Sequence, residues 1–295
     1  MFKRVGLFLL TNIAVMVLLS IVVFILERFF GISLSGNGYI FVVAIVIGFG
    51  GAFISLALSK WMAKRAYNIV LITSDNISSL DKKERIVWDV VSDLADRNHI
   101  KMPEVGIYKD MDPNAFATGA TKNSSLVAVS TGLLESMDEA AIEGVVAHEM
   151  AHILNGDMVT MTLLQGVLNT FVIFFARVVA NIISNFLDEE LSWLAYYGVV
   201  ILLEIIFGIF ASIIVMAFSR HREFKADEGS AKFVGKEKMI AGLQALKKMQ
   251  HLAGGEKSKL ASMKISTKKK GGIMALFSSH PDLDDRIKKL EELSI

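Results

Sequence analysis

The sequence predicts an α-helical membrane protein that has four transmembrane helices and a cytoplasmic α+β domain. Three observations lead to this fold class. The chain is unusually apolar, because 53% of its 295 residues are hydrophobic and its mean hydropathy is +0.50. The apolar residues gather in four long runs. The remaining segments show the mixed helix and strand patterns of a soluble domain.

Composition narrows the chemistry before any motif is considered. The chain has 31 basic and 30 acidic residues and a net charge of +1 at pH 7, which averages over segments of opposite character and so says little about nucleic acid. No nucleic-acid partner is expected. It has no cysteine, which excludes disulfides and thiolate metal sites. Any metal must therefore be held by histidine, aspartate, glutamate or water.

The first two apolar runs predict two N-terminal transmembrane helices. Residues 5–26 carry no charge and, as a helix, span about 33 Å, which exceeds a hydrocarbon core of roughly 30 Å. A cleaved signal peptide is the alternative, but its apolar core usually has only about 7 to 15 residues. Residues 29–59 are likewise uncharged and contain small residues suited to close helix packing, namely Gly48, Gly51, Ala52 and Ser55.

The other two runs predict a transmembrane hairpin. One begins after Asp157 and continues past Arg177 to Leu187, and the other covers residues 191–219 with Glu204 inside it. A buried soluble hairpin is the alternative, although the length and the lack of a polar face favour two spans. The two charged residues fall at similar depth, so they either pair with each other or separately reach the headgroups and water.

Basic residues beside the predicted spans set the orientation. Those expected on one side are Lys3, Arg4, Lys60, Lys64, Arg65, Arg220, Arg222 and Lys225. The opposite loops contain Arg28 and the acidic residues Asp188, Glu189 and Glu190. Because positively charged loops remain in the cytoplasm, both termini and both polar segments are expected on the cytoplasmic side.

These assignments divide the chain into four consecutive parts. Residues 1–62 form the two N-terminal transmembrane helices, and residues 158–219 form the hairpin. Residues 63–157 and 220–295 form the first and second parts of one cytoplasmic domain. Within the last part, the lysine-rich residues 257–272 predict a polar loop, or alternatively a contact with anionic lipid.

The cytoplasmic segments contain recognisable helix and strand patterns. Residues 81–100 place apolar positions at helical spacing between charged ones, which predicts an amphipathic helix. The stretches "PEVGIYK" from Pro103 and "SSLVAVST" from Ser124 are typical of short strands, with "DPNAFATGATKN" between them. Ser136 and Glu139 have the spacing of a capping box, which predicts that the next helix starts there.

That next helix carries the pattern H-E-x-x-H. His148 and His152 are four residues apart, so on a helix they project from one face and can hold a single cation. Glu149 lies beside them and can act on a water molecule at that cation. The imidazole ligands suit zinc, and a catalytic zinc needs a third protein ligand. An extended motif would place glycine and histidine where Asn155 and Met158 stand, so the third ligand must come from elsewhere.

The predicted hairpin supplies that ligand by returning the chain to the side it left. "SRHREFKADEGSAKFVG" from Ser219 then lies near the first two ligands. Glu223 and Asp227 are one helical turn apart, so Glu223 can reach the metal while Asp227 accepts a hydrogen bond from a ligating imidazole. His221 is the alternative ligand, although it points off that face.

Four stretches together resemble one known family. "HEMAH", "REFKAD", "PNAFATGA" and the N-terminal "LFLLTNIAVM" are similar to the HtpX family of bacterial membrane-bound zinc metalloproteases, whose wider family includes the CAAX prenyl proteases. The likeness covers nearly the whole chain. It implies a zincin-like (gluzincin) metalloprotease domain with one Zn²⁺ per chain, held by His148, His152 and Glu223. It also implies that Glu149 is the catalytic base.

The resemblance further implies a role in protein quality control and the stress response. Misfolded or damaged membrane proteins and other unfolded polypeptides would be cleaved at the cytoplasmic face of the bacterial inner membrane, with the lipid bilayer as the protein's surroundings. The oligomeric state is not indicated. The lysine-rich segment has no assigned counterpart in the family pattern.

Two weaker site predictions follow. "NAFATG" fits an edge strand that pairs with an extended substrate, which favours Asn114 and Ala115 as substrate-binding residues, with an ordinary strand and turn as the alternative. His280, which precedes Pro281, resembles the family's His-Pro and is expected to stabilise the oxyanion. A loop histidine without a role is its alternative.

Other functions remain to be distinguished from this one. A prenyl-peptide processing enzyme is the alternative within the same reaction class, although that type usually has a larger membrane chamber than four spans enclose. A transporter or channel is the alternative from a different class, because Arg177 and Glu204 place charge within predicted spans.

Overall fold

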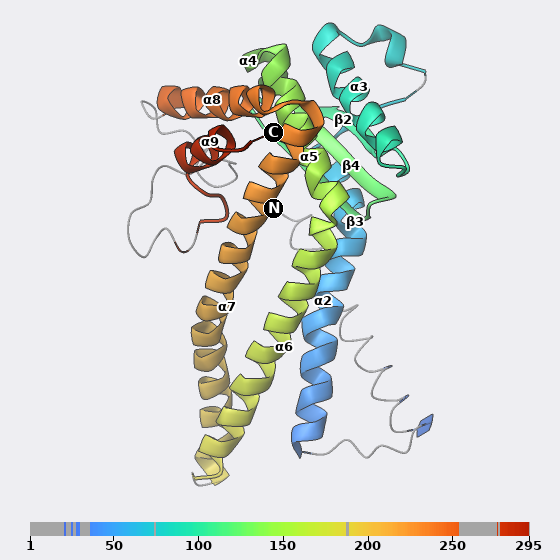
Figure 1. Ribbon diagram of the computed structural model, residues 1–295. Coiled ribbons are helices and arrows are strands. Elements are labelled where there is room, and N and C mark those ends of the chain that lie inside the picture. Colours follow the sequence, from blue (N-terminus) through green and yellow to red (C-terminus); the bar gives the residue numbers. More distant parts are fainter. Residues whose placement is uncertain are drawn as a thin grey trace. The chain divides into compact units, whose positions relative to one another are not determined.

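The computed structural model describes residues 36–294 except 74, 187, 188, 254–275 and 277, together with residues 21, 25, 28 and 29 (Figure 1). The predicted first span at residues 5–26, the basic residues Lys3 and Arg4, and the lysine-rich segment 257–272 lie outside the described residues. The chain divides into two compact units. The first contains the described residues up to Ala57 together with Thr160–Val215, and the second contains Leu58–Val159 and Met216–Ile295.

Three long apolar helices provide the residues of the first unit, namely α2 (Gly36–Ala66), α6 (Asp157–Ser184) and α7 (Glu189–Val234). Each is long and apolar enough to cross a membrane. Three of the four predicted spans are therefore present as helices among the described residues.

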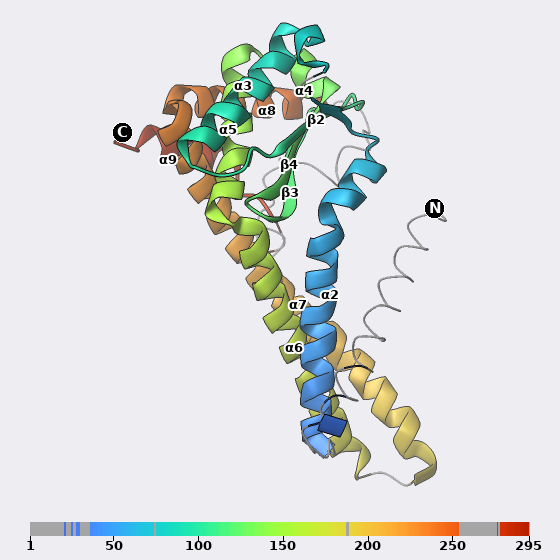
Figure 2. The same cartoon turned by 90° about the vertical axis from the view of Figure 1, so that its right-hand side faces the viewer.

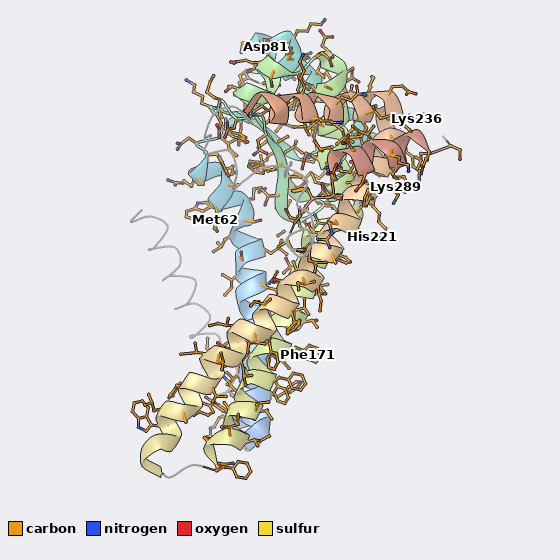
Figure 3. All side chains as sticks on the ribbon, turned by 90° about the vertical axis from the view of Figure 1, so that its left-hand side faces the viewer. Met62, Asp81, Phe171, His221, Lys236 and Lys289 are labelled. Carbon is orange, nitrogen blue, oxygen red and sulfur yellow. The ribbon has the colours of Figure 1, made fainter. Side chains whose placement is uncertain are left out.

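The surfaces of α6 and α7 discriminate between a membrane hairpin and a buried soluble one. Phe171 on α6, labelled in Figure 3, points outward from the helix and is 54% exposed. Ile201 and Phe210 on α7 are 59% and 61% exposed. A soluble hairpin would bury such side chains, because contiguous apolar surface of this extent is costly in water. The exposed apolar surfaces therefore favour membrane spans over a buried soluble hairpin.

Two contacts within the first unit bear on the sequence predictions. A side chain on Gly48 of α2 would meet Thr170 Oγ1 of α6 at 2.4 Å, so a small residue is needed for this close helix packing, as predicted. Arg177 Nη1 lies 2.6 Å from Glu204 Oε1, so these two residues pair, which was one of the two open interpretations.

The second unit contains a four-stranded sheet in the order β1-β2-β4-β3. Its strands are β1 (Val70–Ile72), β2 (Glu104–Tyr108), β3 (Ala115–Thr121) and β4 (Ser124–Ser130). β2 and β4 are parallel, whereas the other two pairs are antiparallel. Three strands were predicted, and the "NAFATG" strand, β3, lies at the edge as expected. The three-residue β1 was not predicted, because it is too short to show a pattern.

Three helices pack on the sheet, namely α3 (Lys82–Arg97), α4 (Thr131–Ser136) and α5 (Glu139–Asn155). Helix α8 (Lys236–Ala253) packs on α5, and α9 (Leu283–Glu291) packs on α8. A short 3-10 helix spans Ile77–Ser79. Figure 2 shows α3 and α5 on the same side of the strands. The main hydrophobic core joins these helices and the sheet and includes Val127, Val129, Ile142, Val146 and Leu243. The opposite face carries a smaller group of aromatic rings formed by Tyr67, Tyr108 and Phe116.

The start of α5 differs from the prediction. Its N-cap is Asp138, whose side chain accepts a hydrogen bond from the Ala141 amide. Ser136 is the last residue of α4, and its hydroxyl donates to the Gly132 carbonyl at 2.5 Å. The capping-box assignment was therefore wrong, because Ser136 belongs to the preceding helical turn and its hydroxyl already has a partner.

The end of α5 is set by a single glycine. Gly156 has φ +71°, the left-handed conformation that favours glycine, and its amide donates to the Ile153 carbonyl at 3.0 Å. The next helix, α6, begins at once with Asp157. This sharp turn places Asp157 beside the helix that has just ended.

Candidate metal centre

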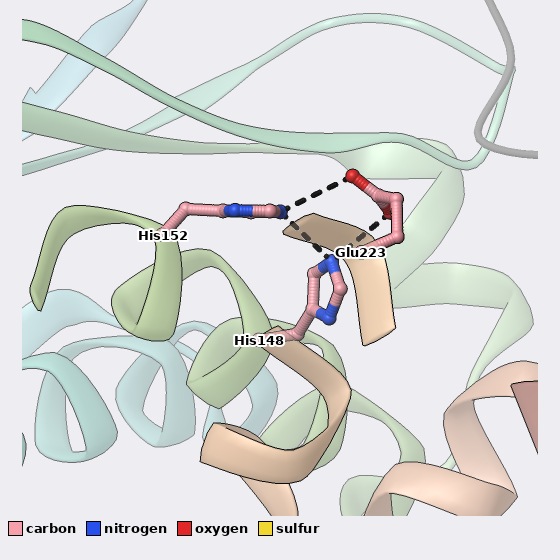
Figure 4. A group of neighbouring side chains, drawn as sticks. All are labelled: His148, His152 and Glu223. Atoms are coloured by element: carbon pink, nitrogen blue, oxygen red, sulfur yellow. Dashed lines mark hydrogen bonds and ion pairs between the residues drawn. The ribbon is translucent and has the colours of Figure 1, made fainter. Parts of the chain in front are cut away.

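Three buried side chains converge at the centre of the second unit (Figure 4). The Nε2 atoms of His148 and His152, both on α5, lie 3.2 Å apart. Glu223 of α7 approaches them, with Oε2 at 3.5 Å from Nε2 of His148 and Oε1 at 3.4 Å from Nε2 of His152. One ligand atom from each residue therefore fits within a 4.8 Å span, as a shared metal ion requires.

The chemistry of these donors fits a divalent metal. Two imidazole nitrogens and one carboxylate are a donor set that catalytic zinc sites use. Glu223 Oε2 is buried and has no well-directed hydrogen bond, although His280 Nδ1 lies 2.9 Å away. A cation between the three residues would satisfy this oxygen, because buried polar atoms rarely lack a partner.

The electrostatics of the site also favour a positive ion. Burial alone would lower the pKa of His148, but Asp227 and Glu223 outweigh it and raise the pKa to about 10. Burial alone would raise the pKa of Glu223, but contacts with His148, His152 and His280 hold that pKa well below its ordinary value. The surrounding carboxylates thus stabilise positive charge at the point where the ligand atoms meet.

Each imidazole has a carboxylate at its other nitrogen. Asp227 Oδ1 lies 2.9 Å from Nδ1 of His148, at the position that the one-turn spacing from Glu223 predicted. Asp157 Oδ2 lies 2.6 Å from Nδ1 of His152. Carboxylates at Nδ1 orient both rings so that Nε2 faces the metal position.

Two arginines contact the carboxylates that surround the histidines. Arg286 of α9, only 1% exposed, donates from Nε and Nη2 to the two oxygens of Asp227 at 2.7 and 2.6 Å. Its Nη1 lies 3.4 Å from Glu223 Oε2. On the other side, Arg222 Nε lies 3.5 Å from Asp157 Oδ2. Glu149, Asp157, Glu223 and Asp227 therefore outnumber the two guanidinium groups, and a divalent cation would balance the remaining negative charge when both imidazoles are neutral.

Sequence reasoning missed Asp157, Arg222 and Arg286. For Arg286 a usable signal existed, because it occupies the apolar face of an otherwise polar helix between the buried Leu283 and Leu290. A charged residue at such a position needs a buried partner of opposite charge. Asp157 gave no comparable signal, as the Gly156 turn alone brings it to His152.

Glu149 lies between this group and the edge strand. Its Oε2 accepts a hydrogen bond from the Ala117 amide of β3 at 2.8 Å. The side chain is buried, yet it lines the same cavity of about 350 Å³ as His148, His152 and Glu223. A carboxylate in this place can take a proton from a water molecule next to the metal ligands.

Only some residues at the start of the edge strand β3 have backbone groups that are not bonded to β4. Asn114 uses both its amide and its carbonyl on Ser130 of β4, at 2.9 Å each. Because backbone direction alternates along a strand, Ala115 and Ala117 turn their backbone groups away from β4, and the Ala117 amide already donates to Glu149. The Asn114 side chain donates to the Tyr108 hydroxyl at 2.8 Å. Of the two residues predicted to bind substrate, Ala115 thus has the outward-facing backbone, and the binding itself stays a prediction.

The remaining histidines take different positions. His280 lines the cavity, with Nδ1 2.9 Å from Glu223 Oε2. Its segment is held by Arg220, which donates to the carbonyls of Leu276 and Ser278 at 3.1 and 2.8 Å. His221, the alternative ligand, is exposed on α7 (Figure 3), and it is not among the three residues that converge.

Comparison with known proteins decides the family. Residues 81–294 match the family described as Peptidase family M48. The chain belongs to peptidase family M48. The matched part includes every residue of the site just described. Tyr67, which follows α2 and also lines the cavity, precedes the matched part.

Relatives within the M48 family extend the likeness to the whole chain. The chain is 51% identical to Protease HtpX of Tolumonas auensis over 299 residues, covering 99% of each chain. It is 48% identical to a Protease HtpX homolog of Bacillus licheniformis over 297 residues, covering 98% of this chain and 99% of that one. The resemblance to the HtpX family is confirmed, and this M48 chain is a metalloprotease.

A solved structure shares the fold. The crystal structure of S. mikatae Ste24p superposes with a TM-score of 0.61 at 16% identity. The match covers 98% of this chain, which spans 64% of the length of that protein. At this identity the likeness describes the fold alone.

Proposed function

We propose that this protein is a zinc-dependent membrane endopeptidase that hydrolyses peptide bonds of misfolded or damaged membrane proteins at the cytoplasmic face of the bacterial inner membrane. One observation carries the proposal. His148, His152 and Glu223 converge in a single cavity with Glu149, beside the free edge of β3. The role in quality control and the stress response is part of the proposal and follows from the resemblance to the HtpX family.

Each residue has a distinct task in the proposed reaction. Zinc held by His148, His152 and Glu223 would supply Lewis-acid activation of water and of the peptide carbonyl. Glu149 accepts the proton of the attacking water and passes it to the leaving nitrogen. Ala115 binds the substrate backbone in an extended conformation, and Asn114 fixes the start of that strand. His280 donates to the oxyanion that develops on the carbonyl.

The chain order supports a site next to the membrane. The helix that carries His148 and His152 ends at Asn155, and the candidate span α6 begins at Asp157. Glu223 lies on the same helix, α7, as the next candidate span. With spans bounded near residues 62, 157 and 219, and basic residues flanking them, the cytoplasmic side holds the site and both termini.

A base variant tests the proposed reaction directly. Glu149→Ala should lower the rate of casein cleavage by about 10²-fold or more, because no other carboxylate in the cavity is free to take the proton. Its zinc content should equal that of the parent. Glu143→Ala, on the same helix but outside the cavity lining, serves as the control and should cleave casein at the parental rate. Parental cleavage by Glu149→Ala would refute the catalytic assignment.

A further inference from the structure

The free edge of β3 separates two different environments. Ala115 and Ala117 pack on the side of the sheet that carries α5 and the metal ligands. Phe116, between them, packs with Tyr108 on the opposite side. A peptide paired with this edge would alternate in the same way, since successive side chains of a strand point to opposite faces. Every second side chain of the peptide would therefore point away from the metal ligands, toward the face of the sheet that carries Phe116.

The second environment is aromatic. Tyr67 follows directly after α2, and its ring centroid lies 5.3 Å from that of Phe116. Both rings are half-buried, and both line the cavity that contains Glu149 and the metal ligands. The buried Tyr108 ring packs against both, with its centroid 5.0 Å from that of Tyr67 and 5.8 Å from that of Phe116. The rings are thus fixed by packing while one side of each remains accessible from the cavity.

The charged residues that line the cavity are Glu149, Arg222 and Glu223, and each has a partner: Glu149 accepts from the Ala117 amide, Arg222 lies beside Asp157, and Glu223 lies between the two histidines. Met158 adds a further apolar side chain to the cavity wall. An apolar or aromatic side chain gains free energy from such a surface, while a charged one loses hydration without a partner.

We infer that Tyr67 and Phe116 form a specificity subsite, which accepts a large apolar side chain of a peptide bound along β3, close to the bond that is cut. The inference rests on the proposed function. It assigns the enzyme a preference for the apolar segments that a damaged membrane protein exposes.

A peptide series tests the subsite in the detergent-solubilised full chain. Quenched fluorescent peptides carry Phe, Leu, Ser or Asp, in turn, at each of three positions on either side of the cut bond, which is located by mass spectrometry. At one position, kcat/KM for Phe should exceed that for Ser by about tenfold or more, the scale that apolar contacts provide. Phe116→Ala and Tyr67→Ala should each lower this ratio several-fold.

Matched variants separate a subsite from a fold defect. Tyr67→Phe keeps the ring and should keep the ratio, and Phe116→Leu should lower it less than Phe116→Ala. Trp61→Ala removes an exposed aromatic residue of α2 that is outside the cavity lining, and it should leave the ratio unchanged. If the parent cuts all peptides equally, or if Phe116→Ala and Tyr67→Ala keep the parental ratio, the subsite is refuted while the peptidase assignment stands. Failure of the parent to cut any peptide or casein would instead overturn the proposed function together with the subsite.

Discussion

The two histidines of the metal group receive their support from different parts of the chain. His152 is oriented by Asp157, five residues further on, through the turn at Gly156. His148 is oriented by Asp227 of α7, which is itself held by Arg286 of α9. The first support depends mainly on a local turn, whereas the second forms only when three distant helices have packed.

The two ion pairs that hold these carboxylates differ in burial. The Arg286 side chain is 1% exposed and binds both oxygens of Asp227. The Arg222 side chain is 17% exposed and approaches Asp157 only to 3.5 Å. A buried charge pair is far more costly to break than a partly hydrated one, because the remaining partner stays without solvent. The His148 side should therefore respond more strongly to substitution than the His152 side.

The largest effect is expected at Arg286. Arg286→Met leaves Asp227 and Glu223 buried without their cation, which should lower the free energy of unfolding by about 3–5 kcal/mol. Thermal unfolding in detergent measures the change, with exposed Lys288→Met on the same helix as the control, expected to change it by about 0.5 kcal/mol or less. Equal stability of the two variants would show that the buried pair is not a structural requirement.

A matched pair of amide variants compares the contributions of the Asp227 and Asp157 carboxylates. Asp227→Asn and Asp157→Asn should each weaken zinc binding by about 10–100-fold, because both carboxylates fix an imidazole ring. Asp227→Asn should have the larger effect, since it also removes the negative charge that pairs with the buried Arg286 guanidinium. Competition with a chromophoric chelator gives both affinities, and a larger loss in Asp157→Asn would reverse the proposed order.

The smallest effect is expected at the turn itself. Gly156→Ala places a side chain at φ +71°, where it has space beside Lys122, so only backbone strain of about 1–2 kcal/mol is expected. The turn that aligns Asp157 should also loosen, so zinc affinity should fall modestly. Gly235→Ala, at φ +97° between α7 and α8, is the matched control, with similar destabilisation and no loss of affinity. Identical zinc binding in the two variants would argue against a role of this turn in the site.

The sequence predicted what depends on helical periodicity. The four-residue spacing of His148 and His152 and the four-residue spacing of Glu223 and Asp227 each define one helix face. Those four side chains meet in the structure, because the hairpin predicted between them returns the chain to the same place. The edge strand and the amphipathic helix α3 were likewise predicted from local patterns.

Features that depend on a turn or on long-range packing were not predicted. Asp157 is five residues from His152, a spacing that separates side chains on a continuous helix, and only the left-handed Gly156 reverses this. Ser136 matched a capping box by spacing, but the chain had not yet left α4. Arg286 is far from its partners in sequence, and a salt bridge between distant helices leaves no periodic signal beyond its position on an apolar face.

The central claim is that the hairpin brings Glu223 to the two histidines of α5 around one metal ion. Elemental analysis of purified parent, Glu223→Ala and His221→Ala proteins, each dialysed against the same zinc buffer, tests it most directly. We expect about one zinc per chain in the parent and in His221→Ala, and far less in Glu223→Ala. Parental zinc in Glu223→Ala, with loss in His221→Ala, would contradict the claim and assign the third ligand to His221.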